Sequence, residues 1–259
     1  MKRRLFVAST ALIGLGARAQ VADLNDAINK AGRQRMLSQR ASKAYLALVH
    51  KVEARNAQQV LDQSIALFER QLVELKSFAP SAAIRGTYDT LGAAWSDFKK
   101  ELTSPTPSKA DAAKVVKLDG AVLALAHQGT VQYEAASDKS AGKLVNIAGR
   151  QRMLSQRMAK FYLASALQID PAGSAAELAK ARSEFVAALE ILRSAPGDTT
   201  QIKEELVLAD AQWVFFSNGL QRLEGASASP KLMSDVFITS ENLLGIMDRI
   251  TTLYSNLKT

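Results

Sequence analysis

The chain contains the same ten letters twice. AGRQRMLSQR occupies residues 31–40 and again residues 148–157. The likeness extends to residues 28–47 and 145–164, which match at 15 of 20 positions. Aromatic and leucine positions further along also align, so a whole unit of about 117 residues is duplicated. This duplication constrains the fold strongly, because both halves of the chain have to form the same structural unit.

Within each copy the apolar positions have the period of an α-helix. In the first copy, Leu37, Ala41, Ala44 and Leu48 follow the spacing of a helix face directed to a core. Segments rich in helix breakers divide each copy into four pieces. These segments lie near Asn56 and at 79–81, 104–108, 170–173, 195–198 and 225–230. The sequence therefore predicts an all-α fold of two tandem antiparallel four-helix bundles, related by internal duplication.

The first residues have the form of a secretory signal peptide. Basic residues at 2–4 precede an apolar run at 5–16, and Ala17-Arg18-Ala19 has the form that signal peptidase cleaves. We expect residues 1–19 to be the signal peptide, residues 20–137 the first bundle and residues 138–259 the second. The expected location is the periplasm, and the alternative is an uncleaved N-terminal anchor. The formal net charge is +8, half of it in residues 1–19, so the mature chain gives no indication of nucleic-acid binding.

The repeated decamer carries three arginines and no acid. No acid lies between Asp26 and Glu53 or between Asp138 and Asp170, whereas each interval holds six lysines and arginines. The acid–base pairs at i,i+4 that stabilise ordinary surface helices are therefore missing. Either acids from other helices approach these cations, or a free anion does.

On a helical wheel Arg35 lies nearly opposite the core-facing stripe, together with Gly32 and Gln39. Small and hydrogen-bonding neighbours allow another helix to approach closely, which draws the arginine partly out of water. The polar positions of the motif are identical in the second copy, whereas the core positions Ala41 and Ala44 differ there. We therefore expect an anion site formed by Arg35, Arg152, Gly32, Gly149, Gln39 and Gln156.

Arg33 and Arg40 lie together in a third direction on the same wheel. We expect them either to form ion pairs with acids across the bundle or to act as secondary ligands. Their equivalents, Arg150 and Arg157, are also candidates for secondary ligands.

The motif also carries a family resemblance. The pattern N-x-A-G-x-x-R-M-x-S-x-R resembles the P-box of NarX-type nitrate and nitrite sensor kinases, and more closely the PilJ-type sensing domain of type IV pilus and nitrate chemoreceptors. It occurs at residues 29–40 and 146–157. The resemblance implies a periplasmic four-helix bundle in which two motif helices meet at a dimer axis and one arginine from each binds a nitrate or nitrite ion. That arginine aligns with Arg35 and Arg152. Those sensors also have transmembrane helices and cytoplasmic signalling modules, which we do not expect here.

Other chemistry finds little support in the sequence. The chain has no cysteine, and His50 and His127 lie in unrelated contexts without the ligand spacing of a zinc site. Nucleotide-binding and hydrolase motifs are absent. Trp95 and Trp213 occupy equivalent positions and are most simply core or helix-interface residues. We expect no enzyme, no metal and no cofactor.

Two functions remain open. The first is a periplasmic nitrate- or nitrite-binding sensory protein that presents its liganded state to a membrane sensor or transporter. The second is a helical envelope protein, associated with pili or chemoreceptors, whose basic motifs dock an acidic protein partner.

The duplication also suggests how one chain could complete a two-fold site. If the first helix of each copy packs side by side and parallel, a monomer acts as a pseudo-dimer that holds one anion between the two motif helices. This arrangement requires a turn at residues 136–142, which contain capping residues and Gly142. A helix that continues through this segment is the alternative, and it would separate the two motifs by tens of ångströms.

Overall fold

The computed structural model describes residues 20–137, 140–195, 198–221 and 228–257. Over these residues the chain is all-α and contains no strand, as the sequence predicts. The helices are α1 (Leu24–Val49), α2 (Ala54–Phe78), α3 (Ala82–Leu102), α4 (Lys109–Ala135), α5 (Ser140–Ala166), α6 (Pro171–Arg193), α7 (Thr200–Gln221) and α8 (Pro230–Ser255). The predicted signal peptide lies outside the described residues. None of the described helices has the length and apolar character needed to cross a membrane.

Short polar residues start most of these helices. The side chain of Ser108 accepts a hydrogen bond from the backbone N–H of Asp111, three residues into α4. Such an N-cap satisfies one of the amide groups that the first turn of a helix leaves without a partner. The same kind of cap occurs at Asp23, Ser81, Asp170 and Ser229. Proline follows the cap directly in α6 and α8, where its missing N–H costs nothing.

The duplication is visible in the backbone of the connection between the first two helices of each copy. Lys51 and Glu53 adopt positive φ angles between α1 and α2, and Gln168 and Asp170 do so between α5 and α6. The expected break near Asn56 is therefore misplaced, because the chain reverses through these left-handed residues and Asn56 already lies in α2. The two copies repeat even this local backbone conformation.

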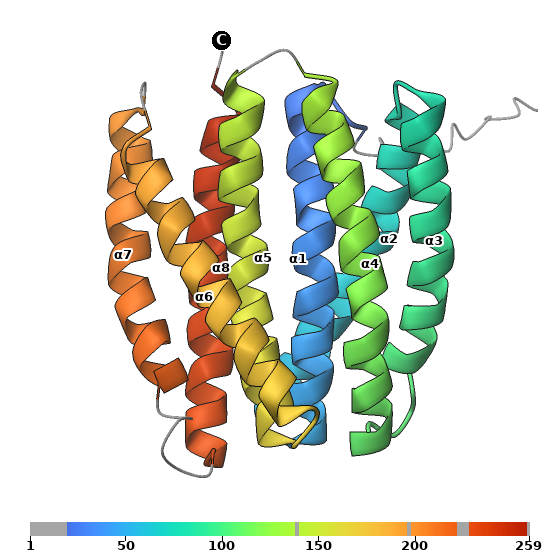
Figure 1. Cartoon of the computed structure of the whole chain (residues 1–259), viewed down its shortest axis with the longest axis vertical. Helices are drawn as coiled ribbons and strands as arrows, with labels where there is room; N and C mark the ends of the chain where they lie inside the picture. Colours follow the sequence, from blue (N-terminus) through green and yellow to red (C-terminus); the bar gives the residue numbers. More distant parts are fainter. Residues whose placement is uncertain (1–19, 138–139, 196–197, 222–227, 258–259) are drawn as a thin grey trace, which may run out of the picture.

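Helices α1–α4 form one antiparallel bundle and α5–α8 form a second one beside it (Figure 1). Helix α4 ends at Ala135 and α5 begins at Ser140, and the two run in opposite directions (Figure 1), so the chain reverses between the bundles. This reversal is as predicted and the continuous helix is wrong, while residues 138–139 of the predicted turn lie outside the described residues. Both α1 and α5 start at the same end of the molecule and pack directly against each other (Figure 1).

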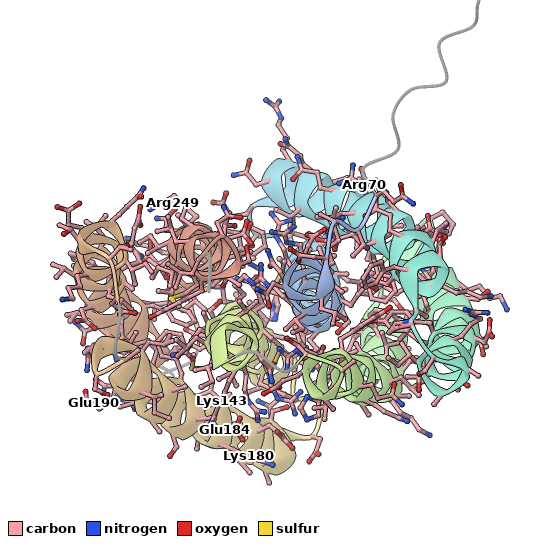
Figure 2. All side chains as sticks on the ribbon, turned by 90° about the horizontal axis from the view of Figure 1, so that it is seen from above. Arg70, Lys143, Lys180, Glu184, Glu190 and Arg249 are labelled. Carbon is pink, nitrogen blue, oxygen red and sulfur yellow. The ribbon has the colours of Figure 1, made fainter. Side chains whose placement is uncertain are left out.

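The two motif helices therefore occupy the middle of the molecule. Viewed along the helix axes, α1 and α5 lie at the centre and the other helices surround them (Figure 2). Almost every residue of α1 between Ala27 and Ala47 is buried. A helix in this position has no solvent face, since one side packs in its own bundle and the other side packs on the second bundle.

A continuous buried cluster runs through both bundles. Each bundle contributes an equivalent aromatic group: Phe68 stacks on Trp95 with ring centroids 3.6 Å apart, and Phe185 stacks on Trp213 at 4.6 Å. The expectation that both tryptophans belong to the core or to a helix interface is confirmed, since Trp95 is buried and Trp213 packs against the cluster.

Candidate functional site

The site is organised by the contact between two glycines. A Cβ atom on Gly32 would lie 4.0 Å from the Cα of Gly149, 3.2 Å from Nη2 of Arg35 and 3.5 Å from Nη2 of Arg152. The glycines thus allow α1 and α5 to approach closely, and both guanidinium groups occupy the space beside them. The structure brings together four of the predicted site residues at the interface between the bundles.

Arg35 is buried without an acidic partner. Its residue is 1% exposed, and Nη2 donates to Oδ1 of Asn146 on α5 at 2.8 Å. Its Nη1 lies 3.3 Å from Nδ1 of His127 on α4, and its Nε has no hydrogen-bond partner. Among the residues that the structure describes, no carboxylate forms an ion pair with Arg35. The carboxylate of Glu134 on α4 acts on Arg35 at longer range, since its Oε2 accepts from Nδ2 of the same Asn146. A fully buried cation without a carboxylate in direct contact is unfavourable unless a ligand supplies further counter-charge.

Arg152 is equally buried, but it has a carboxylate. Its Nη1 donates to Oδ1 of Asp248 on α8 at 2.5 Å, and its Nη2 donates to the backbone oxygen of Asn29 at 3.0 Å. The same Asp248 oxygen also lies 2.8 Å from Nη2 of Arg33. Arg152 therefore already has the anionic partner that Arg35 lacks, which the sequence did not predict.

Burial and neighbouring cations both disfavour the charged guanidinium groups. Burial lowers the pKa of Arg35 to about 9, the positive charges of Arg150 and Arg152 contribute to the shift, and the negative charge of Glu134 opposes it. Burial, followed by the charge of Arg33, lowers the pKa of Arg152 to about 10, and Asp248 opposes the shift. Both groups still carry a positive charge at neutral pH. An anion near Arg35 would therefore relieve repulsion that the fold now tolerates.

Acids from other helices approach the remaining motif arginines. Arg40 pairs with Glu241 on α8, and on α6 Glu184 pairs with Arg150 and Glu177 with Arg157. Together with the Arg33–Asp248 pair, these contacts confirm the expectation that acids from other helices balance these cations. Arg33 and Arg40 reach acids on α8, whereas Arg35 reaches Asn146 on α5 and His127 on α4.

The two glutamines of the motif have partners within the fold. Nε2 of Gln39 donates to Oδ1 of Asp119 on α4, and Nε2 of Gln156 donates to the backbone oxygen of Ser240 on α8, both at 2.9 Å. The predicted ligand residues Gln39 and Gln156 thus tie each motif helix to the fourth helix of its own bundle. Among the described residues, neither glutamine side chain forms a hydrogen bond with the guanidinium group of Arg35 or Arg152.

A cavity of about 260 Å³ opens beside Arg35, between α4, α5 and α6. Arg35, His127 and Met153 are among its lining residues, together with the predicted secondary residues Arg150 and Arg157. Glu184 and Lys180 of α6 also line it, and Figure 2 shows these two side chains next to each other at the periphery of the molecule. The cavity therefore leads from the surface to a buried guanidinium group.

The sequence analysis considered His127 only as a zinc ligand and did not single out Asp248. Both lie against the motif arginines in the structure. The signal that could have found them is the alignment of the fourth helices, in which Tyr133 matches Tyr254 and His127 then falls on Asp248. Among the described residues, no cluster of His, Asp or Glu could hold a metal ion.

Comparison with known proteins agrees with the duplicated motif. A family model described as the N-terminal domain of type IV pili methyl-accepting chemotaxis transducers, PilJ, matches residues 19–120 and 133–214. Searches of curated proteins and of solved structures find no match.

Proposed function

Because this chain belongs to the PilJ family of type IV pili chemotaxis transducer N-terminal domains, we propose that it is a sensory domain that binds one nitrate or nitrite ion at Arg35. The family match covers both copies of the repeat and supports a signal-sensing role. The identity of the ligand rests on the resemblance of the repeated motif to nitrate-sensing domains and on the chemistry of the site.

The observation that carries the proposal is the environment of Arg35. This side chain is buried, its Nε has no partner, and it lies on the wall of a cavity. Among the described residues it is the motif arginine without a carboxylate partner. A small anion that enters the cavity would supply a counter-charge in direct contact with the guanidinium group.

A planar oxyanion fits a guanidinium group well. The donors of the guanidinium group lie in one plane and match two oxygens of nitrate or nitrite in parallel. The ligand is small, and the best small ligands gain about 1.5 kcal/mol per heavy atom. Nitrate has four heavy atoms, so we expect a dissociation constant on the order of 10–100 µM.

The setting of the protein is part of the proposal. The signal-peptide-like start of the chain supports export to the periplasm. There the liganded protein would present its state to a membrane sensor or transporter. Because both motif helices come from one chain, we expect a monomer to be sufficient for binding.

The burial of the decamer disfavours docking of an acidic protein partner. In the structure, Arg33, Arg40, Arg150, Arg152 and Arg157 all pair with acids of this chain. A surface that recruits an acidic partner needs exposed cations, and these are already neutralised. Binding of a small anion therefore remains the preferred function.

Isothermal titration of the mature protein with nitrate, nitrite and chloride tests this function. We expect one nitrate or nitrite per chain, weaker binding of chloride, and loss of binding in Arg35→Met. Arg249→Met is the matched control, because Arg249 lies on the surface of α8 in an ion pair with Glu205. Absence of nitrate and nitrite binding at millimolar concentrations, or equal binding by Arg35→Met, would refute the proposal.

A further inference from the structure

The fourth helices of the two bundles are equivalent residue by residue. Thr130 and Tyr133 of α4 are buried, as are Thr251 and Tyr254 of α8. Thr130 donates to the backbone oxygen four residues earlier at 2.8 Å, and Thr251 does the same at 2.7 Å. His127 lies three residues before Thr130, and Asp248 lies three residues before Thr251, so the two residues align in sequence. The two residues therefore occupy the same position in the two bundles.

In the second bundle this position holds a carboxylate between two arginines. Asp248 accepts from Arg152 of α5 at 2.5 Å and from Arg33 of α1 at 2.8 Å. A carboxylate group is planar and carries one negative charge over two oxygens, as nitrite does. Asp248 thus shows how this fold holds a planar oxyanion.

In the first bundle the equivalent arginines surround a histidine. The counterparts of Arg152 and Arg33 are Arg35 of α1 and Arg150 of α5. Arg35 and Arg150 line the same cavity as His127, and both of their charges, after burial, lower the pKa of the imidazole. The position that is negative in the second bundle is therefore occupied by a neutral ring in the first.

We infer that the anion binds between Arg35 and Arg150 in this cavity, beside the His127 ring, which takes the place of the Asp248 carboxylate. The residue at positions 127 and 248 then decides which bundle admits an external anion. This inference rests on the proposed function and refines it, since it replaces Arg152 by Arg150 as the second arginine of the site.

The Asp248 carboxylate between its two arginines also indicates the class of ligand. Asp248 presents a trigonal carboxylate, so the first bundle should accept small planar anions such as nitrate, nitrite and formate. A tetrahedral sulfate matches this arrangement less well. Oε2 of Glu184 lies 2.6 Å from Nη2 of Arg150. Glu184 and the anion therefore compete for this arginine, which weakens its attraction for the anion.

A matched pair of arginine variants tests which side of the interface binds the anion. Arg150→Met should weaken nitrate binding at least tenfold, because Arg150 lines the cavity. Arg33→Met removes the equivalent arginine of the second bundle and should change the affinity by less than threefold. Equal affinities of the two variants, or a larger loss in Arg33→Met, would overturn the inference.

Exchange of the residue at position 127 tests the role of the histidine. His127→Asp places a carboxylate beside Arg35 and should abolish nitrate binding, whereas the neutral His127→Asn should keep the affinity within a few fold. Asp248→Asn removes the internal carboxylate and should allow a second nitrate to bind. If Asp248→Asn does not fold, Asp248→His provides the same test. Nitrate binding by His127→Asp at the wild-type level would overturn the inference.

A measurement without ligand separates this inference from the proposed function. In anion-poor buffer, His127→Asp should unfold at a higher temperature than His127→Asn, because the new carboxylate pairs with the buried guanidinium group. If it does so while the wild-type protein binds no nitrate, only the proposed function fails. If His127→Asp unfolds at a lower temperature than His127→Asn, the inference itself is wrong.

Discussion

Lys160 of the second bundle lies 2.8 Å from Asp119 of the first, and both side chains are 1% exposed. Asp119 also accepts hydrogen bonds from Gln39 and Ser42 of α1. Lys43, the counterpart of Lys160, reaches in the opposite direction to Ser240 and Glu241 on α8. The motif helices therefore carry a pair of crossed polar contacts, each of which joins one bundle to the fourth helix of the other.

The first prediction concerns this buried ion pair. Asp119→Asn leaves the ammonium group of Lys160 buried without a counter-charge, so we expect a loss of about 3–5 kcal/mol in the free energy of unfolding. Urea denaturation provides the measurement. Lys231→Met is the control, because Lys231 and Asp235 form an exposed pair that should contribute less than about 1 kcal/mol. A loss in Asp119→Asn as small as that of the control would contradict the prediction.

The second prediction compares the two central arginines. Arg35→Met removes a buried charge that has no carboxylate partner, and methionine fills much of the same volume, so the stability of the fold should change by less than about 1 kcal/mol. Arg152→Met leaves Asp248 paired only with Arg33 and should cost about 1–3 kcal/mol. Thermal and urea unfolding of both variants give the comparison. The reverse order of stability would show that Arg35 has a counter-charge in solution.

The third prediction concerns the glycine contact. Gly32→Ala places a methyl group 3.2 Å from Nη2 of Arg35, so the guanidinium group has to move. We expect a loss of about 1–3 kcal/mol from crowding and weaker nitrate binding. In Gly86→Ala the new methyl group meets nothing within 4 Å, so the better helix propensity of alanine should stabilise α3 by up to about 1 kcal/mol. Equal unfolding midpoints and affinities for the two variants would rule out a tight contact at Gly32.

The fourth prediction concerns pH. Burial lowers the pKa of His127 below its usual value of 6.5, Arg35 and Arg150 add to the shift, and Glu184 opposes it. The ring is therefore neutral at pH 7 and gains a proton only in more acidic solution. Because the protonated ring adds a positive charge to the site, nitrate affinity should rise as the pH falls through the pKa of His127.

Titration calorimetry between pH 5 and pH 8 measures this dependence, and His127→Asn should remove it. Stability without ligand should change in the opposite direction. Since the folded-state pKa lies below the unfolded value, the unfolded chain binds more protons near pH 6, and the contribution of His127 to stability falls as the pH falls. An affinity that does not depend on pH would place His127 away from the anion.

The duplication favoured the observed arrangement of the motif helices, because two identical polar faces with a glycine at the centre can pack against each other. It did not settle it, since a continuous helix through residues 136–142 would have kept the two motifs apart. The wheel also placed Arg35 and Arg152 on that face. It did not predict that they would be 1% and 0% exposed, because a wheel describes one helix and the burial of α1 comes from the helices packed around it.

The partners of the arginines were harder to predict. Asp248 lies 96 residues from Arg152 along the chain, and its contact depends on how α8 packs against α5. The equivalence of His127 and Asp248 was also difficult to detect, because insertions shift the alignment of the fourth helices relative to that of the first helices. Periodicity gives the face of a helix but not the register between helices from distant parts of the chain.

The direct packing of α1 against α5 also sets how the interface depends on protein concentration. When two separate chains form such an interface, dilution separates them, and ligand affinity becomes coupled to assembly. Here the two helices belong to one chain, so their effective concentration is fixed by the connection between α4 and α5 and not by the number of molecules present. In the site that we propose at this interface, the fraction occupied at a given pH should therefore depend on the anion concentration and not on the protein concentration.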